Sequence, residues 1–214
     1  MGRRKYAAQT ITRRGKTLTR RSASKNVAKA TIKRLITSLA EHKYYDNFAT
    51  GLAMIPTGLI QAGLTTPVQG TGDGQRVGDK VTILSLTIKF DIIGADTTNA
   101  CRVIIFRWGM PTVPVPADVF QTAGVVTTYN SLPNYDRVGQ KQLRVLYDRT
   151  FSTTANGTNA YSRRIRIGKN AGPLEFNNGA ITGTGLIYGL FISDSQIAPH
   201  PSLSWYSRLT YTDM

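Results

Sequence analysis

Apolar and polar residues alternate along most of the chain after residue 43, which is typical of β-strands with one buried face. The clearest alternation spans residues 81–92 and predicts a row of core side chains: Leu84, Leu86, Ile88, Phe90 and Ile92. Two unbroken apolar runs, residues 103–106 and 186–192, predict strands that are covered on both faces. Further strands are expected over residues 43–49, 58–64, 143–147, 160–167 and 203–212.

The number of expected strands is about eight, which is the number in a two-sheet jelly roll. The predicted fold class is therefore all-β, an eight-stranded single jelly-roll sandwich. The long stretch over residues 110–139 contains Pro111, Pro114, Pro116 and Pro133, and it predicts a loop with a short helical turn near residues 118–122.

Two glycine-containing segments resemble functional motifs but are better explained as turns. Residues 70–80 are rich in glycine, yet they lack the spacing of a phosphate-binding loop and lead into a strand instead of a helix. The segment Asn156-Gly157-Thr158 matches a glycosylation acceptor, but Asn-Gly between two strands is first of all a tight hairpin turn.

One amphipathic helix is expected over residues 24–41, ahead of the first strand. Its apolar residues recur at three- and four-residue steps: Ala28, Ile32, Leu35, Ile36 and Leu39. Lys29, Lys33 and Arg34 fall outside this stripe, so the helix could rest on protein with one face and offer cations on another. Alternatively, the helix simply closes one end of the sandwich.

Charge divides the chain into two domains. The 214 residues carry a net charge of +15, and 13 of the 27 Lys/Arg lie in residues 1–43 against the single acidic Glu41. This segment is therefore a basic N-terminal arm of charge +12, with residues 1–21 expected to be disordered when free. Residues 44–214 form the predicted jelly-roll domain, whose net charge is only +3. A basic tail on a nearly neutral domain indicates a polyanionic partner, either nucleic acid or an anionic membrane.

The arm residues are the main candidate nucleic-acid contacts. They are Arg3, Arg4, Lys5, Arg13, Arg14, Lys16, Arg20, Arg21, Lys25, Lys29, Lys33 and Arg34. Neutralising about ten phosphates of a single strand implies a salt slope near −7, or about four decades of affinity between 50 and 200 mM salt. Tyr6 is the only aromatic residue before Tyr44, so the arm does not read bases by stacking. The same basic clusters also fit a nuclear-localisation signal.

A second, weaker basic group lies within the predicted jelly-roll domain. It comprises Arg163, Arg164, Arg166 and Lys169, which Lys141 and Arg144 of the preceding strand would join if the two strands are adjacent. Two interpretations remain open for this group. It could contact nucleic acid inside a particle, or it could form subunit salt bridges with Asp148 or Glu175.

Catalytic and metal-binding patterns find little support. Cys101 is the only cysteine, His42 and His200 lie in no recognisable nucleophile or ligand spacing, and the acidic residues are scattered singly. We therefore expect no enzyme and no cofactor. A structural calcium ion held between subunits would be compatible with such a protein, but the metal ligands are unknown. The N-terminus lacks a signal peptide and no apolar run is long enough to span a bilayer, so we expect a soluble chain without membrane insertion.

Four short segments, taken in order, resemble a known family. They are QGTG at residues 69–72, RVGDKV at 76–81, VLYDRT at 145–150 and WYSRLTYTD at 205–213. The ordered set resembles the single-jelly-roll capsid proteins of small circular Rep-encoding single-stranded DNA (CRESS-DNA) viruses. It is more distantly similar to the coat proteins of satellite tobacco necrosis virus and its relatives.

This resemblance implies a viral capsid protein. Identical subunits would assemble into a T=1 icosahedral shell, and the basic arm would point inward to package single-stranded nucleic acid. The expected helix could bundle with its copies near the threefold axes. The resemblance favours DNA over RNA as cargo, although the satellite relatives package RNA in the same fold. The expected location is the virion, with the host cell nucleus as a second site.

Two other classes of protein could explain parts of the sequence. A non-viral nucleic-acid-binding structural protein, of ribosomal or chromatin type, would account for the basic tail but not for the large β-domain of low net charge. A jelly-roll carbohydrate-binding module or enzyme would leave the arm unexplained.

Overall fold

The computed structural model describes residues 28, 31, 41–95, 98–121, 129–154 and 160–213. The chain divides into two compact units, Met1–Ala40 and Glu41–Met214. The predicted helix over residues 24–41 and the predicted disorder of residues 1–21 lie almost entirely outside the described residues. Of these ranges only Ala28 and Thr31, both helical, and Glu41, which is not helical, are described. The first strand begins at His42, so His42 and Lys43 of the predicted arm belong to the second unit.

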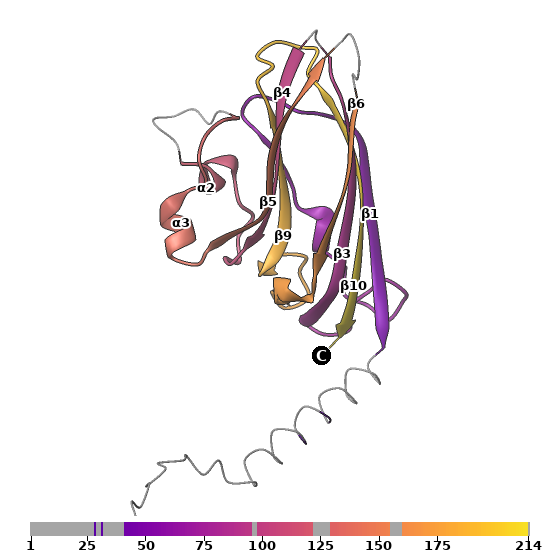
Figure 1. Cartoon of the computed structure of the whole chain (residues 1–214). Helices are drawn as coiled ribbons and strands as arrows, with labels where there is room; N and C mark the ends of the chain where they lie inside the picture. The colour runs from indigo at the N-terminus through magenta and orange to yellow at the C-terminus, as the bar shows by residue number, and fades with distance from the viewer. Residues whose placement is uncertain are drawn as a thin grey trace, which may run out of the picture. The chain divides into compact units, whose positions relative to one another are not determined.

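The second unit is a sandwich of two antiparallel sheets (Figure 1). Sheet A contains β1 (His42–Ala53), β10 (Ser202–Asp213), β3 (Lys80–Ile93), β7 (Pro173–Phe176) and β8 (Gly183–Thr184) in this order, and β6 (Ala160–Gly168) also pairs with β3. Sheet B has the order β2 (Leu59–Gln61), β9 (Leu186–Ser193), β4 (Thr98–Trp108) and β5 (Leu143–Thr154). The predicted all-β sandwich is confirmed.

The strand pairs are nested along the chain. Strand β1 pairs with β10, β2 with β9, β3 with β6, and β4 with β5, and alternate pairs lie in different sheets. This is a jelly-roll-like arrangement. The described residues contain ten strand segments instead of the predicted eight, because the short strands β7 and β8 follow β6 and extend sheet A beside β3.

The core lies between the two sheets. Phe90 of β3 contacts Phe191 of β9 across the sandwich, with ring centroids 6.3 Å apart and the rings edge to face. Burying a side chain of this size stabilises the fold by about 1.5–3 kcal/mol. The predicted inward face of the last strand is buried: Leu203, Trp205, Leu209 and Tyr211.

A β-bulge changes the predicted core face of β3. Thr210 of β10 pairs with Ser85, whereas Tyr211 pairs with Ile83, so Leu84 is an extra residue without a partner in the register. Because the bulge shifts the alternation by one residue, Ile83 is fully buried and Leu84 is only partly buried. The prediction that Leu84 belongs to the core row is therefore wrong. Leu86, Ile88, Phe90 and Ile92 are buried as predicted.

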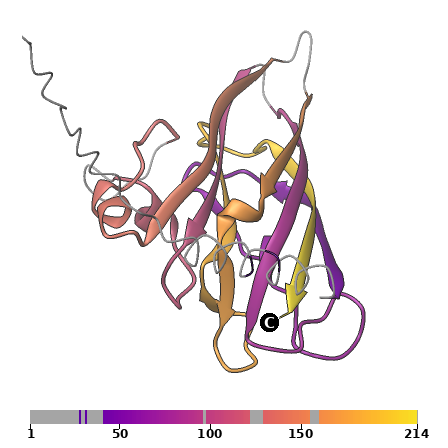
Figure 2. The same ribbon diagram turned by 60° about the horizontal axis from the view of Figure 1, so that its bottom comes forward.

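The long connection between β4 and β5 contains two short helices, α2 (Pro116–Val119) and α3 (Tyr135–Gly139). Both lie outside sheet B, on the side away from sheet A (Figure 2). The predicted helical turn is present but begins earlier than expected, at Pro116, because proline suits the first helical position. Helix α3 was not predicted. Its N-cap Asn134 accepts a hydrogen bond from the Arg137 backbone N–H through its side chain.

The glycine-rich segment before β3 buries an arginine. Arg76 is fully buried and donates hydrogen bonds of 2.7 Å to the Gly78 carbonyl, the Ala180 carbonyl and the Asp79 carboxylate. Its guanidinium also lies 4.1 Å from the centre of the Phe176 ring. These hydrogen bonds therefore connect the loop before β3 to the loop that contains Ala180. The glycine-rich segment leads into β3 as predicted.

Candidate nucleic-acid interface

The second basic group follows β6, which is an edge strand of sheet A paired only with β3 among the described strands. Successive side chains of a strand point to opposite faces. Ile165 is buried against the core, so Arg163 points to the same inner side at the open edge, whereas Arg164 and Arg166 point to the outer face of sheet A. Lys169 follows in the short 3-10 helix η2 (Lys169–Ala171) and is exposed. The structure thus divides the predicted group between two faces of one edge.

Strand β5 borders this group without pairing with β6. It pairs with β4 and forms an edge of sheet B, so the two strands are not neighbours within one sheet. The two edges meet where Phe151 of β5 stacks on Tyr161 of β6, with ring centroids 4.0 Å apart. Arg144 of β5 donates a hydrogen bond of 3.4 Å to the Asn170 carbonyl, beside Lys169. Arg144 thus joins the predicted group, and together with Lys141 and Arg107 it also lines a neighbouring hollow.

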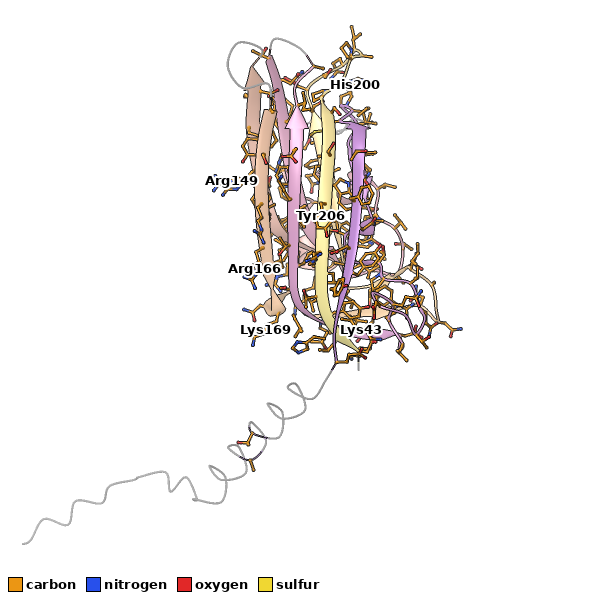
Figure 3. The ribbon with its side chains drawn as sticks, turned by 90° about the vertical axis from the view of Figure 1, so that its right-hand side faces the viewer. Lys43, Arg149, Arg166, Lys169, His200 and Tyr206 are labelled. Carbon is orange, nitrogen blue, oxygen red and sulfur yellow. The ribbon has the colours of Figure 1, made fainter. Side chains whose placement is uncertain are left out.

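Arg149 is a further member that the sequence analysis missed. Burial raises the pKa of Tyr147, the neighbouring Tyr161 adds to the rise, and the charges of Arg163 and Arg149 oppose it. Both arginines are therefore close enough to the Tyr147 hydroxyl to affect its pKa. Figure 3 shows Arg149, Arg166 and Lys169 along one side of the sandwich. In the sequence, Arg149 is a single cation within a strand and belongs to no basic cluster. Only the meeting of the two sheet edges brings it near β6.

The two carboxylates proposed as salt-bridge partners for this group are already paired within the chain. Asp148 accepts two hydrogen bonds of 2.7 Å from Arg102. The Glu175 carboxylate lies 2.9 Å from the Lys80 ammonium nitrogen. The subunit salt bridges would have to compete with these intrachain pairs, which favours the alternative that the basic group meets an external anion.

The outer face of sheet A carries aromatic residues as well as cations. Phe48 of β1, Tyr206 of β10, Lys89 of β3 and Arg164 of β6 are opposite one another in successive strand pairs, and all four are exposed. The next row across the sheet contains Asp46, Arg208, Thr87 and Arg166. Residues from four distant segments therefore share one surface.

The twelve arm residues predicted as the main contacts lie outside the described residues: Arg3, Arg4, Lys5, Arg13, Arg14, Lys16, Arg20, Arg21, Lys25, Lys29, Lys33 and Arg34. Their role therefore stays a prediction.

The described part of the chain contains neither a metal-binding cluster nor a membrane-spanning helix. No group of three or more His, Cys, Asp or Glu among them could hold a metal ion. His200 lies between two prolines, and its Nδ1 is 3.3 Å from the Ser195 hydroxyl. None of the helices within the described ranges has the length and apolar character needed to cross a membrane.

Cys101 is expected to be unreactive in the folded protein. It is fully buried in β4, and burial, with a smaller contribution from Asp194, raises the pKa of its thiol to about 12. Because the thiolate is the nucleophile, alkylation by iodoacetamide at about pH 8 should be roughly a thousandfold slower than for an unfolded cysteine. Mass spectrometry of the labelled protein measures the rate, with guanidinium-unfolded protein as the control. Rapid labelling of the native chain would contradict this burial.

Comparison with known proteins identifies the family of this chain. The family model described as satellite tobacco necrosis virus coat protein matches residues 11–214. The capsid protein of satellite tobacco necrosis virus 1 is 28% identical over 180 residues, which covers 81% of this chain and 88% of the relative. Among solved structures, a chain of Desmodium yellow mottle tymovirus aligns with a TM-score of 0.40 and 10% identity, over 81% of this chain and 82% of the other. Because the family model spans nearly the whole chain, the protein belongs to the satellite tobacco necrosis virus coat protein family.

Proposed function

We propose that this capsid protein assembles from identical subunits into a T=1 icosahedral shell and packages single-stranded nucleic acid through its basic N-terminal arm. Membership of a coat protein family makes the chain a structural protein of the virion. The observation that carries the packaging proposal is the charge division, because residues 1–43 have a net charge of +12 and the remaining residues only +3. Excess positive charge on a short segment suits a sequence-blind contact with phosphates.

The division of labour follows from this charge distribution. The sandwich would supply the geometry of the shell, and the arm would neutralise the cargo. The cations of the arm are expected to act together, since each contributes one released counterion and none needs a defined base. The clusters at residues 3–5 and 13–14 also fit a nuclear-localisation signal, which would place the protein in the host nucleus before assembly.

The cargo proposed is single-stranded DNA. This rests on the ordered motifs that resemble capsid proteins of CRESS-DNA viruses, while single-stranded RNA is the alternative within the same fold. The other alternative, a non-viral nucleic-acid-binding structural protein with a basic tail, is not favoured by the match to a coat protein family over residues 11–214.

Electron microscopy of the purified full-length protein tests the proposal. Across a salt series, we expect uniform round particles, a ratio of absorbance at 260 to 280 nm that indicates nucleic acid, and a subunit count by native mass spectrometry equal to that of a T=1 shell. Nuclease digestion of the extracted cargo separates DNA from RNA. Monomers or small oligomers at every salt concentration would overturn the assembly proposal, and particles free of nucleic acid would overturn the packaging proposal.

A further inference from the structure

The outer face of sheet A exposes three aromatic rings where a sandwich strand ordinarily carries polar residues. Phe48 and Tyr44 of β1 are 68% and 54% exposed, and Tyr206 of β10 is 40% exposed. In antiparallel sheets with one solvated face, the outward positions are usually polar. Apolar groups that gather on an exposed surface mark a place where another molecule binds. Phe48 and Tyr206 are directly paired across the two strands, so their rings start from neighbouring backbone positions.

The cations on the same face differ in whether a carboxylate already neutralises them. Arg208 donates hydrogen bonds of 2.7 and 2.6 Å to Asp46, which lower the pKa of that carboxyl, and its guanidinium lies 5.5 Å from the centre of the Tyr44 ring. The Lys89 ammonium nitrogen lies 3.7 Å from the Asp91 carboxylate. The positive charge of these two residues is therefore largely balanced within the face.

Arg164 and Arg166 supply the surplus charge. Within the described ranges, neither has a carboxylate at ion-pair distance. Both side chains point outward from one edge strand. Arg164 lies in the row of Phe48 and Tyr206, and Arg166 lies in the next row. Figure 3 shows this face with Tyr206 near its middle and Arg166 at the β6 edge. A strand of negative charge that follows the β6 edge would lie about two strand spacings, or roughly 10 Å, from Tyr206.

We propose that the outer face of sheet A is a second nucleic-acid site, on which Arg164 and Arg166 hold the phosphates of a single strand while bases stack on Phe48 and Tyr206. Aromatic rings beside a positively charged track are the usual construction for binding single strands, because every base offers a flat face for stacking. The exposed rings favour a single strand over a duplex, because bases that are already paired and stacked in a duplex cannot stack on the rings. This inference rests on the proposed function and adds to it a contact that senses bases, which the arm cannot make.

Stacking can be separated from charge by comparing oligo(dT) with an abasic DNA strand of the same length. Both strands, and oligo(U) as the RNA counterpart, are titrated into the full-length protein. The arm binds phosphates without regard to bases, so it contributes equally to oligo(dT) and to the abasic strand. The ratio of the two affinities therefore isolates the stacking contribution.

The double variant F48L/Y206L is expected to lower this ratio by about tenfold or more, given that stacking is worth about 1–3 kcal/mol per base and 1.4 kcal/mol is a factor of ten. Its salt slope should be unchanged, because no charge is removed. The matched control is Y135L, since Tyr135 is an exposed aromatic residue of α3, outside sheet A. The variant R164Q/R166Q should instead weaken the binding of oligo(dT) and of the abasic strand equally, and it should reduce the salt slope by about 1.4.

Photo-cross-linking provides a second measurement in the same full-length protein. Strands that carry 5-iodouracil, in DNA and in RNA form, should cross-link to peptides containing Phe48 or Tyr206. A dT-to-abasic ratio that is unchanged in F48L/Y206L, together with cross-links confined to other peptides, would overturn the inference and leave the packaging proposal intact. Absence of binding to every strand would overturn both. Cross-linking to only one of the two strand types would support the site and identify its nucleic acid.

Discussion

Deletion of residues 2–21 is expected to reduce the steepness of the salt dependence of nucleic-acid binding by about 6 units of log–log slope. Eight cations lie in this segment: Arg3, Arg4, Lys5, Arg13, Arg14, Lys16, Arg20 and Arg21. Each neutralised phosphate of a single strand contributes about −0.7 to the slope. Between 50 and 200 mM salt, the full-length chain should therefore lose roughly three decades more affinity than the deletion variant. Fluorescence anisotropy with a labelled oligonucleotide measures both slopes.

A second variant separates the charge of the arm from its length. Replacing the same eight residues by glutamine retains the full chain and should flatten the slope as the deletion does. Circular dichroism must show that the β-domain is unchanged in both variants. A slope that stays within one unit of the wild-type value would refute the role of the arm, whatever the sandwich binds.

The variant R76M is expected to reduce the free energy of unfolding by about 2–3 kcal/mol, because hydrogen bonds from a charged donor are lost. Arg76 is fully buried and supplies the hydrogen-bond donors for the Gly78 and Ala180 carbonyls. Methionine preserves most of the side-chain volume against Phe176 but donates no hydrogen bond, so both carbonyls lose their charged donor. Denaturant unfolding measures the change as a lower midpoint at a constant slope.

The matched control is K80M. Lys80 forms an ion pair with Glu175 at 2.9 Å, but the two side chains are 50% and 53% exposed. An exposed pair of this kind contributes no more than about 1 kcal/mol. If R76M lost as little stability as K80M, the buried hydrogen bonds of Arg76 would not be what holds the loop before β3 to the loop that contains Ala180.

Local pattern was sufficient to predict most strands. The alternation over residues 81–92 and the apolar runs at 103–106 and 186–192 correspond to β3, β4 and β9. The ends of β3 and β9 agree within one residue, whereas β4 is much longer than its run and begins at Thr98. These segments were readable because a strand with one or two buried faces needs a fixed period of apolar residues, whatever it pairs with. The core position of Leu84 was predicted wrongly because the alternation was assumed to continue without a break. A β-bulge depends on the pairing with the partner strand, so the apolar pattern of one strand does not reveal it.

The candidate site shows the same limit. One basic group was predicted because its members are close along the chain: Arg163, Arg164, Arg166 and Lys169. In the structure, the strand alternation directs Arg163 to the inner side of the edge and Arg164 to the outer face. Side-chain direction follows from which face of β6 packs on the core, and that is decided by Ile165 and the register with β3.

The amino-acid sequence by itself determined the strand segments, the separation of a basic arm from a nearly neutral body, and, through ordered motifs, the relation to capsid proteins. Only the tertiary structure decided which residues meet. Phe48, Tyr206, Lys89 and Arg164 come from four segments spread between residues 48 and 206, and the antiparallel register places them in one row. Pairing between distant strands depends on the packing of the entire sandwich, so no local window of sequence contains the information that assembles this surface.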